Sequence, residues 1–165
     1  MLRRAFAPFL LALLALAACG EATPNPVPVP TAPLPTRAPT QPAGAAAAGH
    51  ITVQHILIGF AGSVSGKNIT RTKEQARTLA YQILAQAQGG ADFDALVKQN
   101  TDDSPPGIYS LADNGVTPGA GEYARAGMVP AFGNVGFALK PGEIGIADYD
   151  PQTSPYGWHI IKRLK

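Results

Sequence analysis

Tyr156-Gly157-Trp158-His159-Ile160-Ile161 is the stretch that decides the fold, together with Val53-Gln54-His55-Ile56-Leu57-Ile58 near the other end of the folded part. Both runs are short, apolar and rich in β-branched residues, which is typical of β-strands. Apolar residues occupy both alternating positions, so both strands are predicted to be central and buried. A buried imidazole needs a hydrogen-bond partner, since an unpaired one costs about 1–3 kcal/mol. The sequence therefore predicts one site, formed by His55 and His159 where the first and last strands meet.

Residues 1–18 have the composition of a signal peptide. Two arginines give a positively charged start, and the apolar run after them is too short to span a membrane. The segment ends in Leu16-Ala17-Ala18-Cys19, which is similar to the lipobox of bacterial lipoproteins. That resemblance implies cleavage before Cys19 and lipid attachment to it. Because Gly20 follows, it also implies an outer-membrane location facing the periplasm. The alternative is an ordinary secretory signal with an unrelated cysteine.

Charge and cysteine content exclude several classes of function. Cys19 is the only cysteine, so no disulfide can form within one chain. The chain has 13 lysines and arginines, two of them in the signal peptide, which leaves 11 basic residues against 11 acidic ones. A neutral mature protein offers no electrostatic basis for binding nucleic acid. Membrane attachment must then come from lipid chains rather than from a basic patch.

Residues 19–49 are interpreted as a lipidated, disordered Pro/Ala-rich tether. Eight prolines and almost no large apolar side chains leave this segment unable to bury enough surface to fold. Its prolines favour an extended polyproline II chain of about 3.1 Å per residue. The alternative is a ligand for proline-binding domains. Residues 50–165 remain for one modest core.

Residues 50–165 are predicted to form one α+β domain with an antiparallel sheet. Thr72 and Gln75 have the spacing of a capping box, and Asp92 is a candidate N-cap for a second helix. Pro130 suits the first turn of a third helix. The expected elements, in chain order, are a strand over 51–60, a helix from 72 to 89, a shorter helix from 92, a strand over 108–111, a short helix from 130, and strands over 144–147 and 158–164.

Six segments of the chain match, in order, the segments of one known family, and they are His55–Ile58, Thr70–Ala76, Thr101–Asp103, Gly127–Phe132, Phe137–Ile144 and Tyr156–Lys162. Through these segments the chain resembles the parvulin family of peptidyl-prolyl isomerases. The resemblance implies a parvulin/FKBP-like fold, in which helices surround a four-stranded antiparallel sheet. It also implies cis–trans isomerisation of Xaa-Pro bonds by non-covalent stabilisation of the twisted amide, without a cofactor.

Three residues are implied to be catalytic by this resemblance. His55 and His159 match the paired histidines of the family, although a purely structural role is the alternative. Asp103 stands where parvulins have Cys or Asp, and it would act through charge and hydrogen bonding. Asp103 could instead cap a turn, which is the role we expect for Asp102. A zinc site built from the two histidines and Asp103 lacks any close-spaced ligand motif, so no metal is expected.

Four further residues are implied to bind substrate or support the site. Met128 and Phe132 match the residues of the proline slot, and their spacing would place them on one face of a helix that began early enough. Plain core packing is the alternative for both. Tyr109 falls at another position of the slot. Ser154 falls where a family hydroxyl supports the paired histidines.

Loop composition bears on the expected partners. The loop over residues 61–68 contains only Lys67 as a basic residue, which argues against a clamp for phosphorylated Ser/Thr-Pro. Residues 111–128 are longer than the family pattern and could form a lid or specificity loop, and residues 148–155 are also extended. We expect a monomer that acts on unfolded, proline-containing envelope or secreted proteins. A non-catalytic, peptide-binding chaperone and a structural lipoprotein are the alternative functions.

Overall fold

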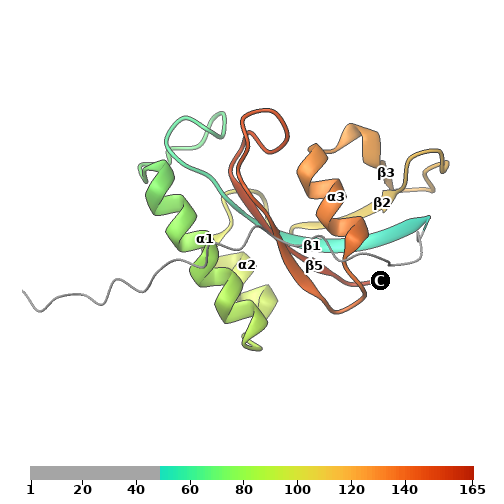
Figure 1. Ribbon diagram of the computed structural model, residues 1–165, viewed down its shortest axis with the longest axis horizontal. Helices are drawn as coiled ribbons and strands as arrows, with labels where there is room; N and C mark the ends of the chain where they lie inside the picture. The colour runs from blue at the N-terminus through green and yellow to red at the C-terminus, as the bar shows by residue number, and fades with distance from the viewer. Residues whose placement is uncertain (1–48) are drawn as a thin grey trace, which may run out of the picture. The chain divides into compact units, whose positions relative to one another are not determined.

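The computed structural model describes residues 49–165, so the predicted signal peptide, Cys19 and most of the tether lie outside the described residues. Among residues 49–165, no helix is both long and apolar enough to cross a membrane. Figure 1 shows how the elements are arranged, and their bounds are β1 (His50–Ile58), α1 (Lys73–Gln88), α2 (Phe93–Asn100), β2 (Ile108–Ala112), β3 (Tyr123–Ala124), the 3-10 helix η1 (Arg125–Gly127), α3 (Pro130–Ala138), β4 (Ile144–Ala147) and β5 (Trp158–Arg163).

The sheet has the strand order β3-β2-β1-β5-β4, which places β1 at its centre. β1 is antiparallel to β2 on one side and to β5 on the other, and β4 is antiparallel to β5. Leu57 on β1 lies opposite His159 on β5. The prediction that the two histidine-containing strands are buried neighbours is therefore confirmed.

The prediction of a four-stranded antiparallel sheet is wrong in one respect, because the sheet is five-stranded and mixed. β3 pairs in parallel with β2, with Leu111 opposite Tyr123 and Ala112 opposite Ala124. Residues 113–122 lead the chain away from β2 and back beside it, so β3 runs in the same direction. A strand of only two exposed residues carries no alternating hydrophobic pattern, which is why the sequence did not reveal it.

Helices cover both faces of the sheet, with α1 and α2 on one face and α3 on the other (Figure 1). Successive side chains of a strand point to opposite faces. Ile56 and Ile58 therefore pack with α1 and α2, whereas Ile51 and Val53 pack with Phe132 of α3. This alternation places His55 on the α3 face of the sheet.

The starts of the helices follow from local sequence. The capping box at α1 is formed, since the Thr72 side chain accepts from the Gln75 N–H and the Gln75 side chain accepts from the Thr72 N–H. α3 begins only at Pro130, with the ring of that proline fitting the first helical turn. Met128 precedes α3 and closes η1, so the helix begins too late for Met128 and Phe132 to share one helical face.

Candidate active site

A pocket of about 260 Å³ opens on the α3 face of the sheet. β1 and β5 contribute the two histidines, and the remaining lining residues come from β1 itself, from the loops after β1 and before β5, and from the segments around α2, β2 and α3. Six residues that the sequence singled out meet here, namely His55, Asp103, Tyr109, Met128, Phe132 and His159. Four others complete the lining, namely Leu57, Val64, Val129 and Tyr156.

A chain of hydrogen bonds runs from the buried interior to the pocket wall. The Nδ1 atoms of His159 and His55 are 3.2 Å apart, and the two rings are stacked with their centroids 5.4 Å apart. On its other side, Nε2 of His55 lies 3.0 Å from Oδ2 of Asp103. The Tyr109 hydroxyl donates to the same carboxylate oxygen at 2.9 Å. Four side chains from three separate parts of the chain thus form one connected group.

The protonation states within this group follow from burial and from the hydrogen bonds. Burial lowers the pKa of His159 to about 3, and the neighbouring His55 acts in the same direction. The hydrogen bond from His55 holds the pKa of the Asp103 carboxyl well below its usual range, despite partial burial. Burial and the Asp103 carboxylate raise the pKa of Tyr109 to about 12. Around neutral pH, Asp103 is therefore ionised, His159 is neutral and Tyr109 keeps its proton.

These states determine where the imidazole protons lie. An ionised Asp103 can only accept, so Nε2 of His55 donates to it. When His55 is neutral, its Nδ1 is an acceptor, and Nδ1 of His159 must donate to it. Nε2 of His159 is then unprotonated, and this buried atom has no hydrogen-bond partner among the described residues. With a neutral His55, the carboxylate thus selects one tautomer for each of the two histidines.

Phe132 forms the apolar floor beside the histidines. Its side chain is only 2% exposed, and its ring meets His55 edge-on at 5.1 Å between centroids and His159 at 5.6 Å. Tyr109 lies 6.0 Å from the same ring. Such edge-to-face contacts favour a fixed ring orientation. The pocket therefore combines an apolar floor with a polar wall that ends in a carboxylate.

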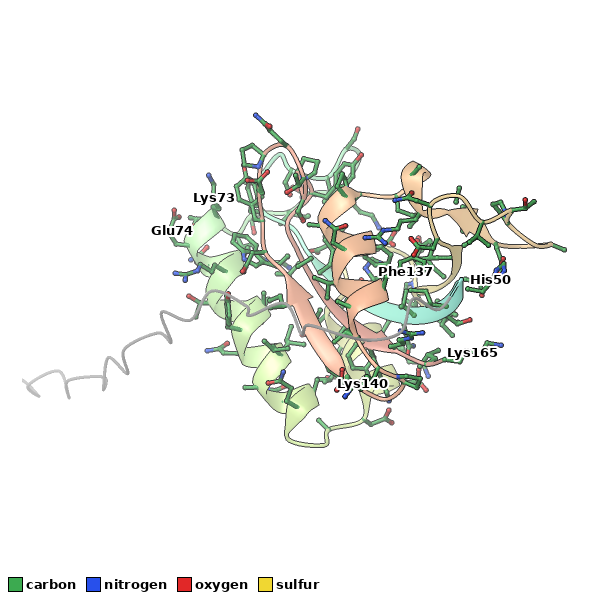
Figure 2. All side chains as sticks on the ribbon, turned by 45° about the vertical axis from the view of Figure 1, so that its right-hand side comes forward. His50, Lys73, Glu74, Phe137, Lys140 and Lys165 are labelled. Atoms are coloured by element: carbon green, nitrogen blue, oxygen red, sulfur yellow. The ribbon has the colours of Figure 1, made fainter. Side chains whose placement is uncertain are left out.

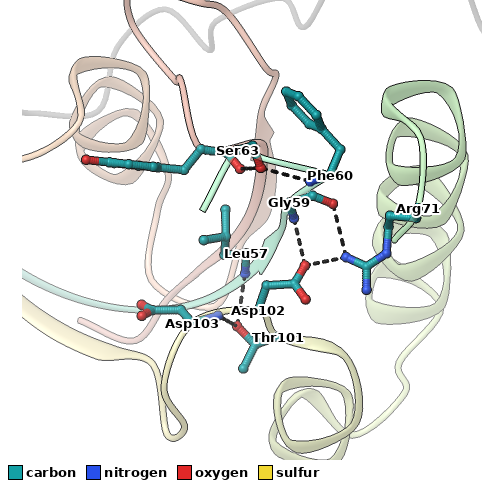
Figure 3. A network of polar contacts seen from close by, with 9 residues as sticks. Leu57, Gly59, Phe60, Ser63, Arg71, Thr101, Asp102 and Asp103 are labelled. Atoms are coloured by element: carbon teal, nitrogen blue, oxygen red, sulfur yellow. Dashed lines mark hydrogen bonds and ion pairs between the residues drawn. The ribbon is translucent and has the colours of Figure 1, made fainter. Parts of the chain in front are cut away.

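The loop that carries Asp103 is bonded to the end of β1 (Figure 3). The Thr101 hydroxyl oxygen accepts from the N–H of Leu57 at 3.1 Å and from the N–H of Asp103 at 3.2 Å. The Asp102 carboxylate accepts from the Gly59 N–H at 2.7 Å and forms an ion pair with Arg71. Asp102 thus holds the loop in place, and the adjacent Asp103 faces the pocket.

Ser154 has a different partner from the one that the sequence suggested. Its buried hydroxyl donates to the carbonyl oxygen of Gly157 at 2.8 Å rather than to either histidine. Ser154 also forms an isolated bridge with Asp150, which closes the turn before β5. Ser154 therefore bonds within the turn that precedes β5 and makes no hydrogen bond to His159.

Two loops meet at the mouth of the pocket. The Ser63 hydroxyl donates to the carbonyl oxygen of Tyr156 and accepts from the N–H of Phe60, each at 2.8 Å (Figure 3). Tyr156 and Val64, the residue after Ser63, both line the pocket.

In the part of the chain that the structure describes, no group of three or more His, Cys, Asp or Glu side chains is arranged to hold a metal ion.

The residues that sequence reasoning missed differ in how they could have been found. Leu57 lies two positions after His55 on β1, so strand alternation alone places it on the same face. Tyr156 belongs to the quoted stretch before His159. Val64 lies in an irregular loop and Val129 is the N-cap residue of α3, and neither position carries a local signal for a pocket.

Three comparisons indicate which known proteins the chain is similar to. A family model described as the PPIC-type PPIase domain matches residues 43–165. Peptidyl-prolyl cis-trans isomerase pin1 of Schizosaccharomyces pombe is 34% identical over 119 residues, covering 70% of this chain and 60% of the yeast protein. Chaperone SurA of Bordetella pertussis is 34% identical over 150 residues, covering 86% of this chain and 25% of SurA. The solution structure of TbPIN1 matches with a TM-score of 0.53 and 26% identity, over 71% of this chain and 98% of that one. The chain spans less than two thirds of the length of these two curated relatives.

Proposed function

Because the chain belongs to the parvulin, or PPIC-type, family of peptidyl-prolyl isomerases, we propose that it catalyses cis–trans isomerisation of Xaa-Pro bonds in polypeptides. The observation that carries this proposal is the apolar pocket in which His159, His55, Asp103 and Tyr109 form one hydrogen-bonded group. The reaction breaks no covalent bond, so a pocket that favours the twisted amide is sufficient. No cofactor is required.

The proposed mechanism is non-covalent stabilisation of the twisted amide. Amide resonance sets a barrier of about 18–20 kcal/mol, and twisting the bond removes that resonance. The proline ring would lie against Phe132 and Met128, where little water remains to stabilise the planar form. The ionised Asp103 and the protonated Tyr109 would supply preorganised polar groups beside the turning amide. The two histidines would hold Asp103 in place from beneath.

The test is the rate of exchange in a short Xaa-Pro peptide, followed by two-dimensional NMR with catalytic amounts of protein. The uncatalysed reaction takes tens to hundreds of seconds, so acceleration is easily detected. Met128→Ala and Asp103→Ala are each expected to lower kcat/KM about tenfold, which corresponds to about 1.4 kcal/mol of lost transition-state stabilisation. Glu74→Gln, which removes a carboxylate in the first turn of α1, is the matched control and is expected to retain the full rate.

Two results would contradict this proposal. The first is a folded wild-type protein that does not accelerate exchange at all. The second is an unchanged kcat/KM in both pocket variants, which would place the reaction elsewhere on the molecule. Circular dichroism of each variant verifies that a lower rate does not reflect unfolding.

A non-catalytic, peptide-binding chaperone is the second candidate function. The similarity to a protein named Chaperone SurA favours it. The exposed side chains Tyr123 and Tyr156, which are 55% and 44% exposed, offer apolar surface for an unfolded chain. Peptide binding without accelerated exchange would support this function, whereas the absence of both would favour a structural role. The expected partners in either case are unfolded polypeptides that contain proline.

We also propose a location, which rests on sequence outside the described residues. Residues 1–18 would be removed as a signal peptide, Cys19 would carry the lipid, and residues 19–49 would tether the domain at the periplasmic face of the outer membrane. The order Leu16-Ala17-Ala18-Cys19 supports this arrangement. In bacterial cells, Cys19→Ala is expected to abolish fatty-acid labelling and to release the protein from the membrane fraction. Equal labelling of both forms would contradict the proposal.

A further inference from the structure

Arg125 connects three segments behind the pocket. Its Nη1 donates to Oδ1 of Asp113 at 2.7 Å, and its Nη2 donates to Oδ1 of Asn134 on α3 at 2.7 Å. The guanidinium carbon also lies 4.8 Å from the centroid of the Phe137 ring. Figure 2 shows Phe137 extending from α3 toward the side of the domain where His50 lies. The Arg125 side chain thus links η1, on which it lies, to the loop after β2 and to Asn134 and Phe137 of α3.

α3 is shaped to receive this side chain at Gly133. A Cβ atom at Gly133 would lie 3.1 Å from Cγ of Arg125 and 3.5 Å from its Nε. That distance is closer than carbon atoms ordinarily pack, so the missing side chain lets the Arg125 stem lie against the helix. A position over an aromatic ring together with two directed hydrogen bonds suits a guanidinium better than an ammonium group. The contact is therefore specific for arginine.

Met128 depends on the turn that Arg125 anchors. The Met128 N–H donates to the carbonyl oxygen of Arg125 at 3.0 Å, which closes η1. Met128 packs against the core cluster under α3, but it also borders a second, smaller cavity of about 140 Å³, which Arg125 and Asn134 line as well. A flexible methionine beside such a space can adopt more than one conformation. The backbone turn that Arg125 anchors would limit where this side chain lies.

We propose that Arg125 is a positioning residue that holds Met128 in the wall of the proline pocket. This inference rests on the proposed function, since it assigns Arg125 a part in substrate binding at that site. Arg125 does not reach the connected group of His159, His55, Asp103 and Tyr109. Loss of the Arg125 side chain should therefore weaken binding of the Xaa-Pro segment, which raises KM, and leave kcat almost unchanged.

The experiment measures KM and kcat of the full chain with one Xaa-Pro peptide. Arg125→Gln is expected to raise KM about fivefold while kcat stays within about twofold, an effect within the range of coupled neighbouring residues. Arg125→Lys keeps the charge facing Asp113 but lacks the planar fork, so about half of the fold-change should be recovered. Gly133→Ala, which leaves every charge in place and displaces the Arg125 stem, is expected to raise KM as well.

Two controls separate positioning from a general structural effect. Arg77→Gln removes another guanidinium that lies over an aromatic ring, that of Tyr81 on α1, and should leave KM unchanged. In a Met128→Ala background, Arg125→Gln should change KM by less than about twofold, because the residue it positions is already gone. An unchanged KM in Arg125→Gln, or full additivity with Met128→Ala, would overturn the proposal.

A second readout keeps this inference separate from the proposed function. The methyl resonance of Met128, observed by carbon–proton NMR, should move and broaden in Arg125→Gln but not in Arg77→Gln. If the wild-type protein accelerates no peptide, the proposed function fails and the resonance alone decides whether Arg125 positions Met128. An identical resonance in wild type and Arg125→Gln would refute the positioning role whatever the activity.

Discussion

His159 is the residue whose burial has the largest consequence for its chemistry. It is 4% exposed, and its pKa of about 3 lies far below the usual value of 6.5. Between these two values, the unfolded chain binds a proton at this position that the folded chain excludes. Stability therefore depends on pH in this window, and it decreases as the pH falls.

The free energy of unfolding is expected to drop by about 1.4 kcal/mol per pH unit as the pH is lowered from about 6.5 toward 4.5. Urea unfolding at several pH values measures this slope. The depressed pKa of Asp103 acts with the same sign, but only at a pH below its ordinary value of 3.8, outside the window tested. His159→Gln supplies the control, and a slope as steep as that of wild type in this variant would contradict the prediction.

Asp102 and Asp103 illustrate how adjacent, chemically identical residues acquire different roles. Asp102 is tied to Gly59 and Arg71, and Asp103 is tied to His55 and Tyr109. The sequence predicted that Asp102 caps a turn, but its carboxylate instead joins the loop to Gly59 and Arg71, whereas Asp103 lines the pocket. The two carboxylates differ only in their partners. Three of these partners lie 30 to 50 positions earlier in the chain, and the fourth, Tyr109, lies six positions after Asp103.

At the level of elements, Gly157 allows β5 to begin directly beside the end of β1. Its φ is +140°, and a Cβ at this position would lie 2.1 Å from the carbonyl oxygen of Ile58. Gly142, before β4, also has a positive φ of +86°, but no atom lies within 4 Å of its would-be Cβ. A substitution at Gly142 therefore tests only the free-energy cost of the positive φ, whereas one at Gly157 adds the steric clash of the new Cβ with Ile58.

Gly157→Ala is expected to lower the free energy of unfolding by about 3 kcal/mol or more, because β5 would be pushed away from β1. Gly142→Ala should cost only about 1–2 kcal/mol, since it pays for the left-handed conformation alone. Urea unfolding of both variants measures the difference. Equal losses would indicate that the close approach to Ile58 can relax without cost.

The starts of elements were more predictable than their relations to one another. Thr72, Asp92 and Pro130 mark helix starts because caps and first turns are local features. β3 was missed because a two-residue strand is defined by its neighbour rather than by its own residues. The boundary of α3 excluded Met128 from the helix, yet the preceding turn still brought it into the pocket.

At the scale of the whole molecule, the two ends of the described domain are paired in its centre. β1 and β5 are adjacent, and the buried apolar residues of the described part lie between Ile51 and Ile161. Long-range pairing of this kind closes the fold only when the last strand is present. Both core clusters, one under α1 and α2 and one under α3, include side chains from these two strands.

A fragment of residues 43–165, the stretch that matches the family model, is expected to unfold cooperatively. Its free energy of unfolding should agree within about 0.5 kcal/mol with that of residues 20–165, because the proline-rich segment offers little apolar surface to bury. Urea unfolding of the two fragments tests this prediction. A markedly weaker short fragment would show that residues 20–42 contribute to the core.

By itself, the sequence determined the α+β class, the helix starts and the two buried strands, and its resemblance to the parvulin family implied six of the residues that line the pocket. It could do so because caps, alternation and ordered motifs are written in neighbouring residues. Only the tertiary structure decided the fifth strand, the partner of Ser154, the chain of hydrogen bonds that links His159, His55 and Asp103, and the contacts of Arg125 with Asp113 and Asn134. Those features are contacts between segments far apart in the chain, and their geometry exists only once the core has packed.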